Sequence, residues 1–340
     1  MYKKNGLIAT YLRVKESGSV SDFPNVMADV QHKILLEAFK GFPSQYDKYC
    51  MIGDLADFKP HNRKWLSETQ DLDNVSGGAP YKNSKLSDRG YAIQAGTYGK
   101  TFQLLREVVL NDDLNAFKKV PASQGRSAKR TLVKQICSIL ESNGNAYDAN
   151  PLFGSRAGTD SQGTSFTDLN DAQTALTADS AGIAAIQAGL LAIATAHDPD
   201  IGEIMGLQAK YLVVSPARAE AAKWIVHATT ILRGSTDAPG NNPLADPALA
   251  GQIEVIVEPF LTRFPNRWYL FADPMQVPTI EVGFLNGQKE PELFMKDSGS
   301  VRASGGRDDF GYEYDDISYK VRWDWGIQTA FYQGAYKGGA

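Results

Sequence analysis

Two short stretches of this 340-residue chain hold residue types that could bind a phosphate or a metal. Gly99-Lys100-Thr101 ends like a phosphate-binding loop, but Gln94 occupies the position where such a loop needs a glycine. His197-Asp198-Pro199-Asp200 combines imidazole and carboxylates, which are ligand types for divalent ions. It follows an Ala-rich helix expected at 179–197, so we favour a role of His197 at the negative helix end. We expect no metal and no cofactor.

Ser215 is the one candidate nucleophile, because it follows a strand-like run and precedes a helix-like run in VVSPARAE. A nucleophile elbow needs Gly-x-Ser-x-Gly, whereas Val213 and Ala217 stand at the glycine positions. Pro216 suits the first position of a helix, so we expect Ser215 to cap that helix. Without a second cluster of acid, base or nucleophile, the sequence indicates no enzyme.

Composition points to a globular protein of two or three packed units, with 43% hydrophobic and 22% charged residues. The net charge of −4 disfavours tight, general nucleic-acid binding but is compatible with a surface that merely faces DNA. No apolar run reaches ~18 residues and the start does not resemble a secretory signal. We expect a protein made in the cytoplasm, with no membrane segment and with Cys50 and Cys137 reduced.

The elements that position these residues are helices in the first half and strands in the last quarter. A helix is predicted at 29–39, stopped by Gly41 and Pro43. A longer helix is predicted to open at Pro121 and to end near Asn143. A strand at 210–216 followed by a helix at 217–232 indicates a small α/β unit. Four runs rich in β-branched and aromatic residues fill 253–337, where turns separate them.

Residues 54–107 form the second unusual region. The segments 54–68 and 91–107 read as extended chain, and the stretch LDNVSGGAPYKNSKLSD between them is polar. An isolated hairpin of this kind is marginal in water because it cannot bury enough apolar surface against itself. We therefore expect a neighbouring subunit to hold it. Solvated surface charge explains its charged residues equally well. The candidate subunit contacts are Lys64, Trp65, Lys82, Lys85 and Arg89.

Several blocks of this chain share their order with one known family. They are PSQYDKYCMIGDLADFKPHNRKWL, YGKTFQLLREVVLNDDLNAFKKVPASQGRSA, NPLF at 150–153, AKYLVVSPARAEAA, NPLADPALAGQIEVIVEPFL, WYLFADPMQVPTIEVGFLNGQKEPEL and ISYKVRWDWGIQTAFYQGAYK. The chain resembles tailed-phage major capsid proteins of the Hong Kong 97 type, close to Mu-type major head proteins. The resemblance implies an α+β fold with an N-terminal arm and first helix (1–53) and an extended loop (54–107). It also implies a peripheral domain with a spine helix (108–150 and 280–340) and an axial domain (151–279).

The function that this resemblance implies is structural. Such proteins self-assemble as pentamers and hexamers into the icosahedral shell of a virion, around double-stranded DNA, in the bacterial cytoplasm. Scaffold, protease and portal proteins are the further partners implied. Some relatives join subunits covalently through a lysine in the extended loop and a C-terminal asparagine, but 317–337 contain no asparagine. An encapsulin-like compartment is the alternative, and an α/β hydrolase is a remote one.

Overall fold

The chain divides into two compact units in the computed structural model. Unit 1 holds the described residues of Met1–Pro43, Gly96–Leu132 and Gln288–Trp325, and unit 2 holds those of Ser44–Ala95, Val133–Gly287 and Gly326–Ala340. The structure describes residues 23–67, 86–105, 116–160, 163–227, 253–296 and 316–339, single residues between 69 and 83, and the pairs 230–231, 240–241, 300–301 and 307–308. Both units combine helices with strands, which confirms the predicted α+β class.

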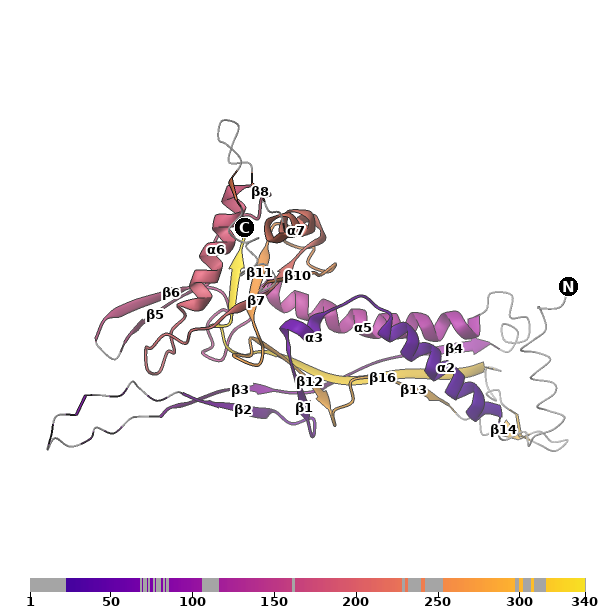
Figure 1. Cartoon of the computed structure of the whole chain (residues 1–340). Coiled ribbons are helices and arrows are strands. Elements are labelled where there is room, and N and C mark those ends of the chain that lie inside the picture. The colour runs from indigo at the N-terminus through magenta and orange to yellow at the C-terminus, as the bar shows by residue number, and fades with distance from the viewer. Residues whose placement is uncertain are drawn as a thin grey trace. The chain divides into compact units, whose positions relative to one another are not determined.

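Strand β16 (Asp316–Thr329) is the longest strand that the structure describes, and its residues up to Trp325 belong to unit 1 (Figure 1). It pairs antiparallel with β4 (Gly96–Leu105) on one side and with β13 (Glu292–Met295) on the other. The Phe102 and Tyr319 rings, directly opposite each other, stack with centroids 5.0 Å apart. Cross-strand aromatic pairs of this kind stabilise a sheet and help to fix its register.

Helix α2 (Phe23–Lys40) crosses helix α5 (Ala116–Ser142) at Gly125. A Cβ on Gly125 would lie 2.2 Å from the carbonyl oxygen of Leu35, so only glycine allows this close approach. Helix α2 also contacts strand β16 through its side chains, since Gln31 Nε2 donates to the Tyr319 hydroxyl at 3.1 Å. The glycine inside a helical pattern therefore has a packing reason.

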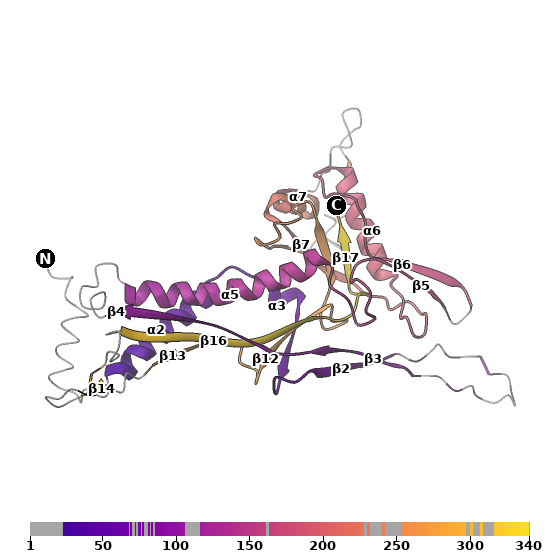
Figure 2. The same ribbon diagram turned by 180° about the vertical axis from the view of Figure 1, so that it is seen from behind.

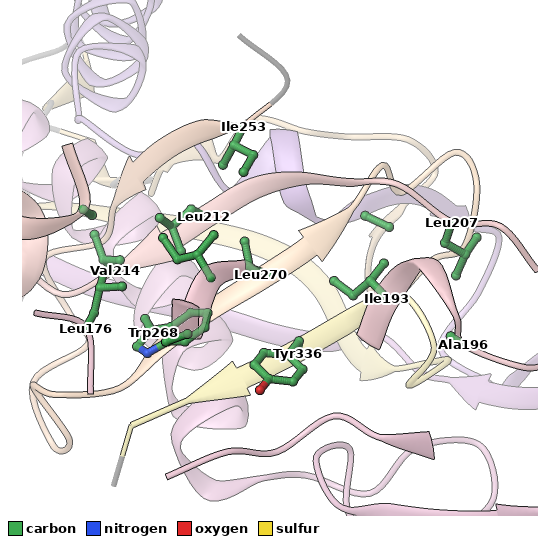
Figure 3. Close-up of a cluster of buried hydrophobic side chains, with 14 of the residues drawn as sticks. Leu176, Ile193, Ala196, Leu207, Leu212, Val214, Ile253, Trp268, Leu270 and Tyr336 are labelled. Atoms are coloured by element: carbon green, nitrogen blue, oxygen red, sulfur yellow. The ribbon is translucent and has the colours of Figure 1, made fainter. Parts of the chain in front are cut away.

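A four-stranded sheet forms the main core of unit 2. Its order is β10 (Glu254–Val257), β7 (Ala209–Val214), β11 (Trp268–Ala272) and β17 (Ala335–Gly338). Strands β10 and β7 are parallel, and the other two pairings are antiparallel. Helix α6 (Ser180–Ala194) packs against β17, β11 and β7, while α7 (Ala219–His227) packs against β10 and β7 (Figure 2). Figure 3 shows buried side chains of this core, among them Trp268, Leu270 and Tyr336.

The remaining elements are short. Unit 2 also contains α3 (Tyr46–Tyr49), the 3-10 helix η1 (Pro216–Arg218), and the strands β1 (Met51–Leu55), β2 (His61–Leu66), β3 (Asp88–Ile93), β5 (Ser155–Thr159), β6 (Ser165–Leu169), β8 (Thr230–Ile231), β9 (Gly240–Asn241) and β12 (Ile280–Leu285). Unit 1 also contains β14 (Ser300–Val301) and β15 (Arg307–Asp308). Strand β1 runs parallel to β12, and three antiparallel pairs, β2–β3, β5–β6 and β8–β9, complete unit 2.

Three predicted helix boundaries are wrong. Helix α5 begins at Ala116, so Pro121 lies inside it and not at its first position. A proline in the second turn removes one backbone hydrogen bond and crowds the carbonyl four residues earlier. The helix, which is 27 residues long, continues through it. Helix α2 begins at Phe23 instead of residue 29, and the helix expected at 217–232 is a 3-10 turn followed by α7, which ends at His227. The strand at 210–216, the Ala-rich helix and the stop before Gly41 are confirmed within a few residues.

Candidate functional site

Strands β2 and β3 form a hairpin (Figure 1). Burial alternates strictly along both strands, so the hairpin has two different faces. The strands pair antiparallel from His61 opposite Ile93 to Leu66 opposite Asp88. One face, called the inner face, is buried or half-buried and consists of His61, Arg63, Trp65, Arg89, Tyr91 and Ile93. The other, called the outer face, is exposed and consists of Asn62, Lys64, Leu66, Asp88, Gly90 and Ala92.

Glu281 of β12 anchors the inner face. Its side chain is fully buried, and its carboxylate accepts hydrogen bonds from Arg63 (Nε–Oε1, 3.0 Å) and from the Tyr91 hydroxyl (2.5 Å). Burial and then this hydrogen bond raise the pKa of Tyr91, which therefore stays a donor. Gly53 of β1 leaves the space, because a Cβ there would lie 2.1 Å from Glu281 Oε1. A buried carboxylate is tolerated when its charge and its lone pairs are satisfied in this way.

Arg89 is the second anchor of the inner face. Its guanidinium is buried and pairs with Asp198 through Nη2, while Nε lies 2.9 Å from Asp200 Oδ2. The turn that carries both carboxylates is preformed, since the backbone N–H of Asp200 donates to Asp198 Oδ1 at 2.9 Å. Gly202 has φ +75°, a conformation that favours glycine, and closes the turn by donating to the Asp198 carbonyl oxygen at 2.7 Å. Two acidic residues thus hold one strand of the hairpin.

An aromatic cluster completes the attachment of the hairpin. The ring of Phe331 is contacted by Trp65 of β2 and Tyr91 of β3, with centroids 5.3 Å and 5.8 Å away. Tyr147 lies on the same ring at 5.0 Å. These edge-to-face and tilted contacts bury apolar surface that the hairpin could not bury against itself. The base of the hairpin is therefore stabilised by its own chain.

The outer face and the distal part of the hairpin differ from the base. Lys64 and Asp88 pair across the strands at 2.6 Å, but both side chains are exposed, so water screens the pair. This hydrogen bond raises the pKa of Lys64 and lowers that of Asp88. Large apolar side chains are exposed here: Leu66 at 60%, Leu72 at 100%, Tyr81 at 87% and Leu86 at 54%. Exposed large apolar side chains that are close together in the sequence are typical of a protein–protein contact surface.

The structure separates the five candidate contact residues. Lys64 lies on the outer face, whereas Trp65 and Arg89 lie on the inner face with partners in their own chain. Lys82 and Lys85 lie outside the described residues. The sequence reasoning missed Glu281, although an acidic residue inside the apolar run TIEVGFL signals a buried partner. No contact with another subunit is tested for any of them, so these five stay predictions.

The predicted role of His197 is wrong, and that of Ser215 is confirmed in position only, since Ser215 directly precedes Pro216 at the start of the 3-10 helix η1. The Ser215 hydroxyl does not cap the helix that follows, because it donates to the Pro265 carbonyl oxygen at 2.6 Å. Helix α6 ends at Ala194, and the ring of His197 instead lies 2.7 Å from Asp168 Oδ1 and stacks on Phe166. In each case a partner distant in sequence replaced the local one.

Neither the candidate phosphate loop nor the candidate metal cluster has the geometry of a binding site in the described part of the chain. Gly99-Lys100-Thr101 lies inside strand β4, and not at the strand-to-helix junction that a phosphate-binding loop occupies. Among the residues that the structure describes, no group of three His, Cys, Asp or Glu side chains has the geometry of a metal site. In the same part of the chain, no helix is long and apolar enough to cross a membrane.

A buried carboxyl group lies at the edge of the core sheet of unit 2. Glu258 directly follows β10, and its backbone N–H donates to Val214 at 3.0 Å. Its side chain is fully buried beside the Tyr49 hydroxyl, 3.4 Å away. Burial raises the pKa of Glu258 to about 7, although the hydrogen bonds from its neighbours lower it. Burial also raises the pKa of Cys50 and of Cys137, so both free cysteines stay protonated thiols.

Comparison with known proteins identifies the kind of protein that carries this hairpin. A family model described as phage capsid protein matches residues 90–338, which is well over half of the chain. The chain belongs to the phage capsid protein family. It is therefore a phage major capsid protein, a structural subunit of a virion shell. No curated protein has a significantly similar sequence.

Comparison with solved structures shows which fold the chain has. The capsid protein of cyanophage P-SCSP1u has a TM-score of 0.53 and 10% identity, with 88% of each chain covered, so the capsid protein has the tailed-phage capsid fold. Two further solved structures are less similar, and no conclusion is based on them. The procapsid of bacteriophage JBD30 has a TM-score of 0.49 and 12% identity, covering 95% of this chain and 76% of that one. The virus-like particle from Pyrococcus furiosus has a TM-score of 0.47 and 11% identity, covering 91% and 97%.

Proposed function

We propose that this capsid protein assembles as pentamers and hexamers into a closed icosahedral shell around double-stranded DNA. The β2–β3 hairpin would be the principal contact between subunits. One observation carries this proposal: the base of the hairpin is fixed by Glu281 and Arg89, while its distal residues expose large apolar side chains. A rigid base with an apolar end is suited to reaching over a neighbouring subunit. Burying these side chains in another copy would remove apolar surface from water.

The same proposal assigns the parts of the chain. Residues 1–53 would be the arm with the first helix, 54–107 the extended loop, 108–150 with 280–340 the peripheral domain, and 151–279 the axial domain. The role is structural, without catalysis, because the candidate nucleophile Ser215 is used as a buried donor to a carbonyl group. Assembly would take place in the bacterial cytoplasm with scaffold, protease and portal proteins.

Electron microscopy of the purified full-length protein tests assembly directly. We expect closed particles or capsomer rings. A matched variant replaces residues 68–86 by Asn-Gly, a favourable two-residue hairpin turn. This variant keeps all residues of β2 and β3. It also keeps Ser67 and Ser87, which follow the paired strands and are joined by a hydrogen bond from the Ser67 N–H to the Ser87 carbonyl oxygen (2.9 Å). We expect this variant to give folded subunits that form no closed shell. Closed shells from the shortened hairpin would refute the proposal.

The contents of the particles distinguish a virion shell from an enzyme compartment. Particles made in infected cells should contain double-stranded DNA that resists nuclease until the shell is opened. Particles that contain a co-purifying enzyme and no DNA would contradict the virion assignment and favour an encapsulin-like compartment.

A further inference from the structure

Helix α5 concentrates positive charge in an otherwise acidic protein. Its 27 residues contain six basic residues and a single acidic residue, Glu141. Subtracting these from the totals of 35 and 39 leaves 29 basic and 38 acidic residues in the rest of the chain. The helix thus has a net charge of +5, whereas the remainder has −9. Such segregation is not expected of a helix that only faces water, where charges of both signs alternate.

Four of these basic residues form one exposed row, here called the basic stripe: Lys119, Arg126, Arg130 and Lys134. The spacings of seven, four and four residues place them on one face of a helix with 3.6 residues per turn. The row is about 22 Å long at 1.5 Å per residue. Ser123 and Ser127 lie between the basic residues and are too short to cover them. Pro121, Gly125, Leu132 and Ile136 are buried on other faces of the helix.

Among the residues that the structure describes, the basic stripe has no acidic partner. Within the described residues, no ion pair joins any of its four side chains to a carboxylate; Arg130 contacts Ser127, and Lys134 lies over the Phe260 ring. Like charges four residues apart repel each other on a helix, and Arg126, Arg130 and Lys134 make two such pairs. The isolated subunit therefore keeps an unfavourable charge arrangement that a polyanion would relieve.

We propose that the basic stripe binds the phosphates of the double-stranded DNA that the shell encloses, an inference that rests on the proposed function above. Guanidinium groups bind phosphate oxygens in a fork geometry. Arg126, Arg130 and Lys134 follow one another at about 6 Å along the helix, and Lys119 lies about 10 Å before Arg126. Contacts of basic side chains with phosphates carry no sequence information, so we expect binding that does not depend on the base sequence. Each contact is weak, but many copies along one duplex reinforce each other.

A charge-matched pair of variants tests the stripe in the full-length protein. The stripe variant carries Arg126→Gln, Arg130→Gln and Lys134→Gln. The control carries Lys59→Gln, Lys223→Gln and Lys289→Gln, which remove the same charge from exposed positions elsewhere. Affinity for a fluorescein-labelled, mixed-sequence duplex of about 30 base pairs is measured between ~50 and ~200 mM salt. The slope of log affinity against log salt should fall by about 0.9 per lost contact, or about 2.7 in all, in the stripe variant.

The control should keep the slope of the unaltered protein, and equal slopes for both variants would overturn the proposal. A conservative variant, Arg126→Lys with Arg130→Lys, should keep the slope, since it keeps the charge. Thermal denaturation should give the stripe variant a Tm no lower than that of the control, because repulsion is removed. If the stripe variant is unfolded, its lower slope supports the proposal only when the conservative variant keeps the slope of the unaltered protein. If the conservative variant also loses the slope, the result counts against the proposal.

Poly-L-glutamate, as a second probe, distinguishes DNA from an acidic protein partner. If the stripe variant loses binding to poly-L-glutamate but binds duplex DNA unchanged, the DNA assignment is wrong. Electron microscopy of the same samples separates this inference from the proposed function. Particles from both variants with loss of DNA binding from one support the stripe. Absence of particles even from the unaltered protein would reject the proposed assembly, while the slopes would still decide the stripe.

Discussion

The core sheet of unit 2 and the β2–β3 hairpin are both made of short strands, but they bury their residues differently. All five residues of β11 are buried, whereas β3 alternates between buried and exposed positions. The core sheet is covered by helices α6 and α7, while the outer face of the hairpin is exposed. The core sheet is therefore covered by its own chain, whereas the hairpin is covered by its own chain on the inner face only. In a shell protein, the uncovered face is where a second copy is expected.

The largest effect is expected in the core sheet. Trp268→Ala should lower the free energy of unfolding by about 3–5 kcal/mol, because it deletes a fully buried indole and leaves a cavity. It also leaves the Thr174 carbonyl oxygen without its donor at 3.0 Å. Urea denaturation of the isolated subunit measures this. A loss below about 1 kcal/mol would mean that the core tolerates cavities and would weaken the comparison.

Arg89→Met tests the inner face of the hairpin. It should lower the free energy of unfolding by about 3 kcal/mol or more, because the buried Asp198 loses its cation. The matched control is Lys64→Met on the outer face, whose exposed pair with Asp88 should contribute nothing measurable. Thermal denaturation compares the two variants. Equal stability of both would contradict the difference between the two faces.

Glu258 gives the core sheet a pH dependence. A carboxyl group whose pKa rises from 4.5 to about 7 on folding holds its proton more tightly in the folded state. The free energy of unfolding should therefore fall as pH rises between these values, by about 3 kcal/mol through this group. Glu258→Gln should stabilise the subunit at pH ~8 and change little at pH ~5. If the free energy of unfolding of this variant depends on pH as it does in the unaltered protein, the dependence comes from other groups.

Part of the hairpin could be predicted from the sequence, because extended chain depends on local features. Of the two segments predicted to be extended, 54–68 contains β2, and β2 does pair with a second strand. That second strand is β3 (Asp88–Ile93), and most of the segment 91–107 is β4, which pairs with β16 instead. The anchors could not be predicted, because Arg63 and Glu281 are 218 positions apart and Arg89 and Asp198 are 109 apart. For the same reason the partners of Ser215 and His197 were missed. Local rules identify an element, but long-range partners decide which of its faces is covered.

The smallest effect on subunit stability, and the largest on assembly, is expected on the exposed apolar residues of the hairpin. Leu66→Ser with Leu86→Ser changes side chains that are 60% and 54% exposed, so the free energy of unfolding should change by less than about 0.5 kcal/mol. Assembly should be lost, because these side chains would be buried only against a second copy.

Sedimentation velocity of this double variant beside the unaltered protein, with matched thermal denaturation, tests the central claim most directly. The account predicts equal Tm values, shells from the unaltered protein and only subunits or capsomers from the variant. Shells of normal size and yield from the variant would contradict the claim that the hairpin is completed by another subunit.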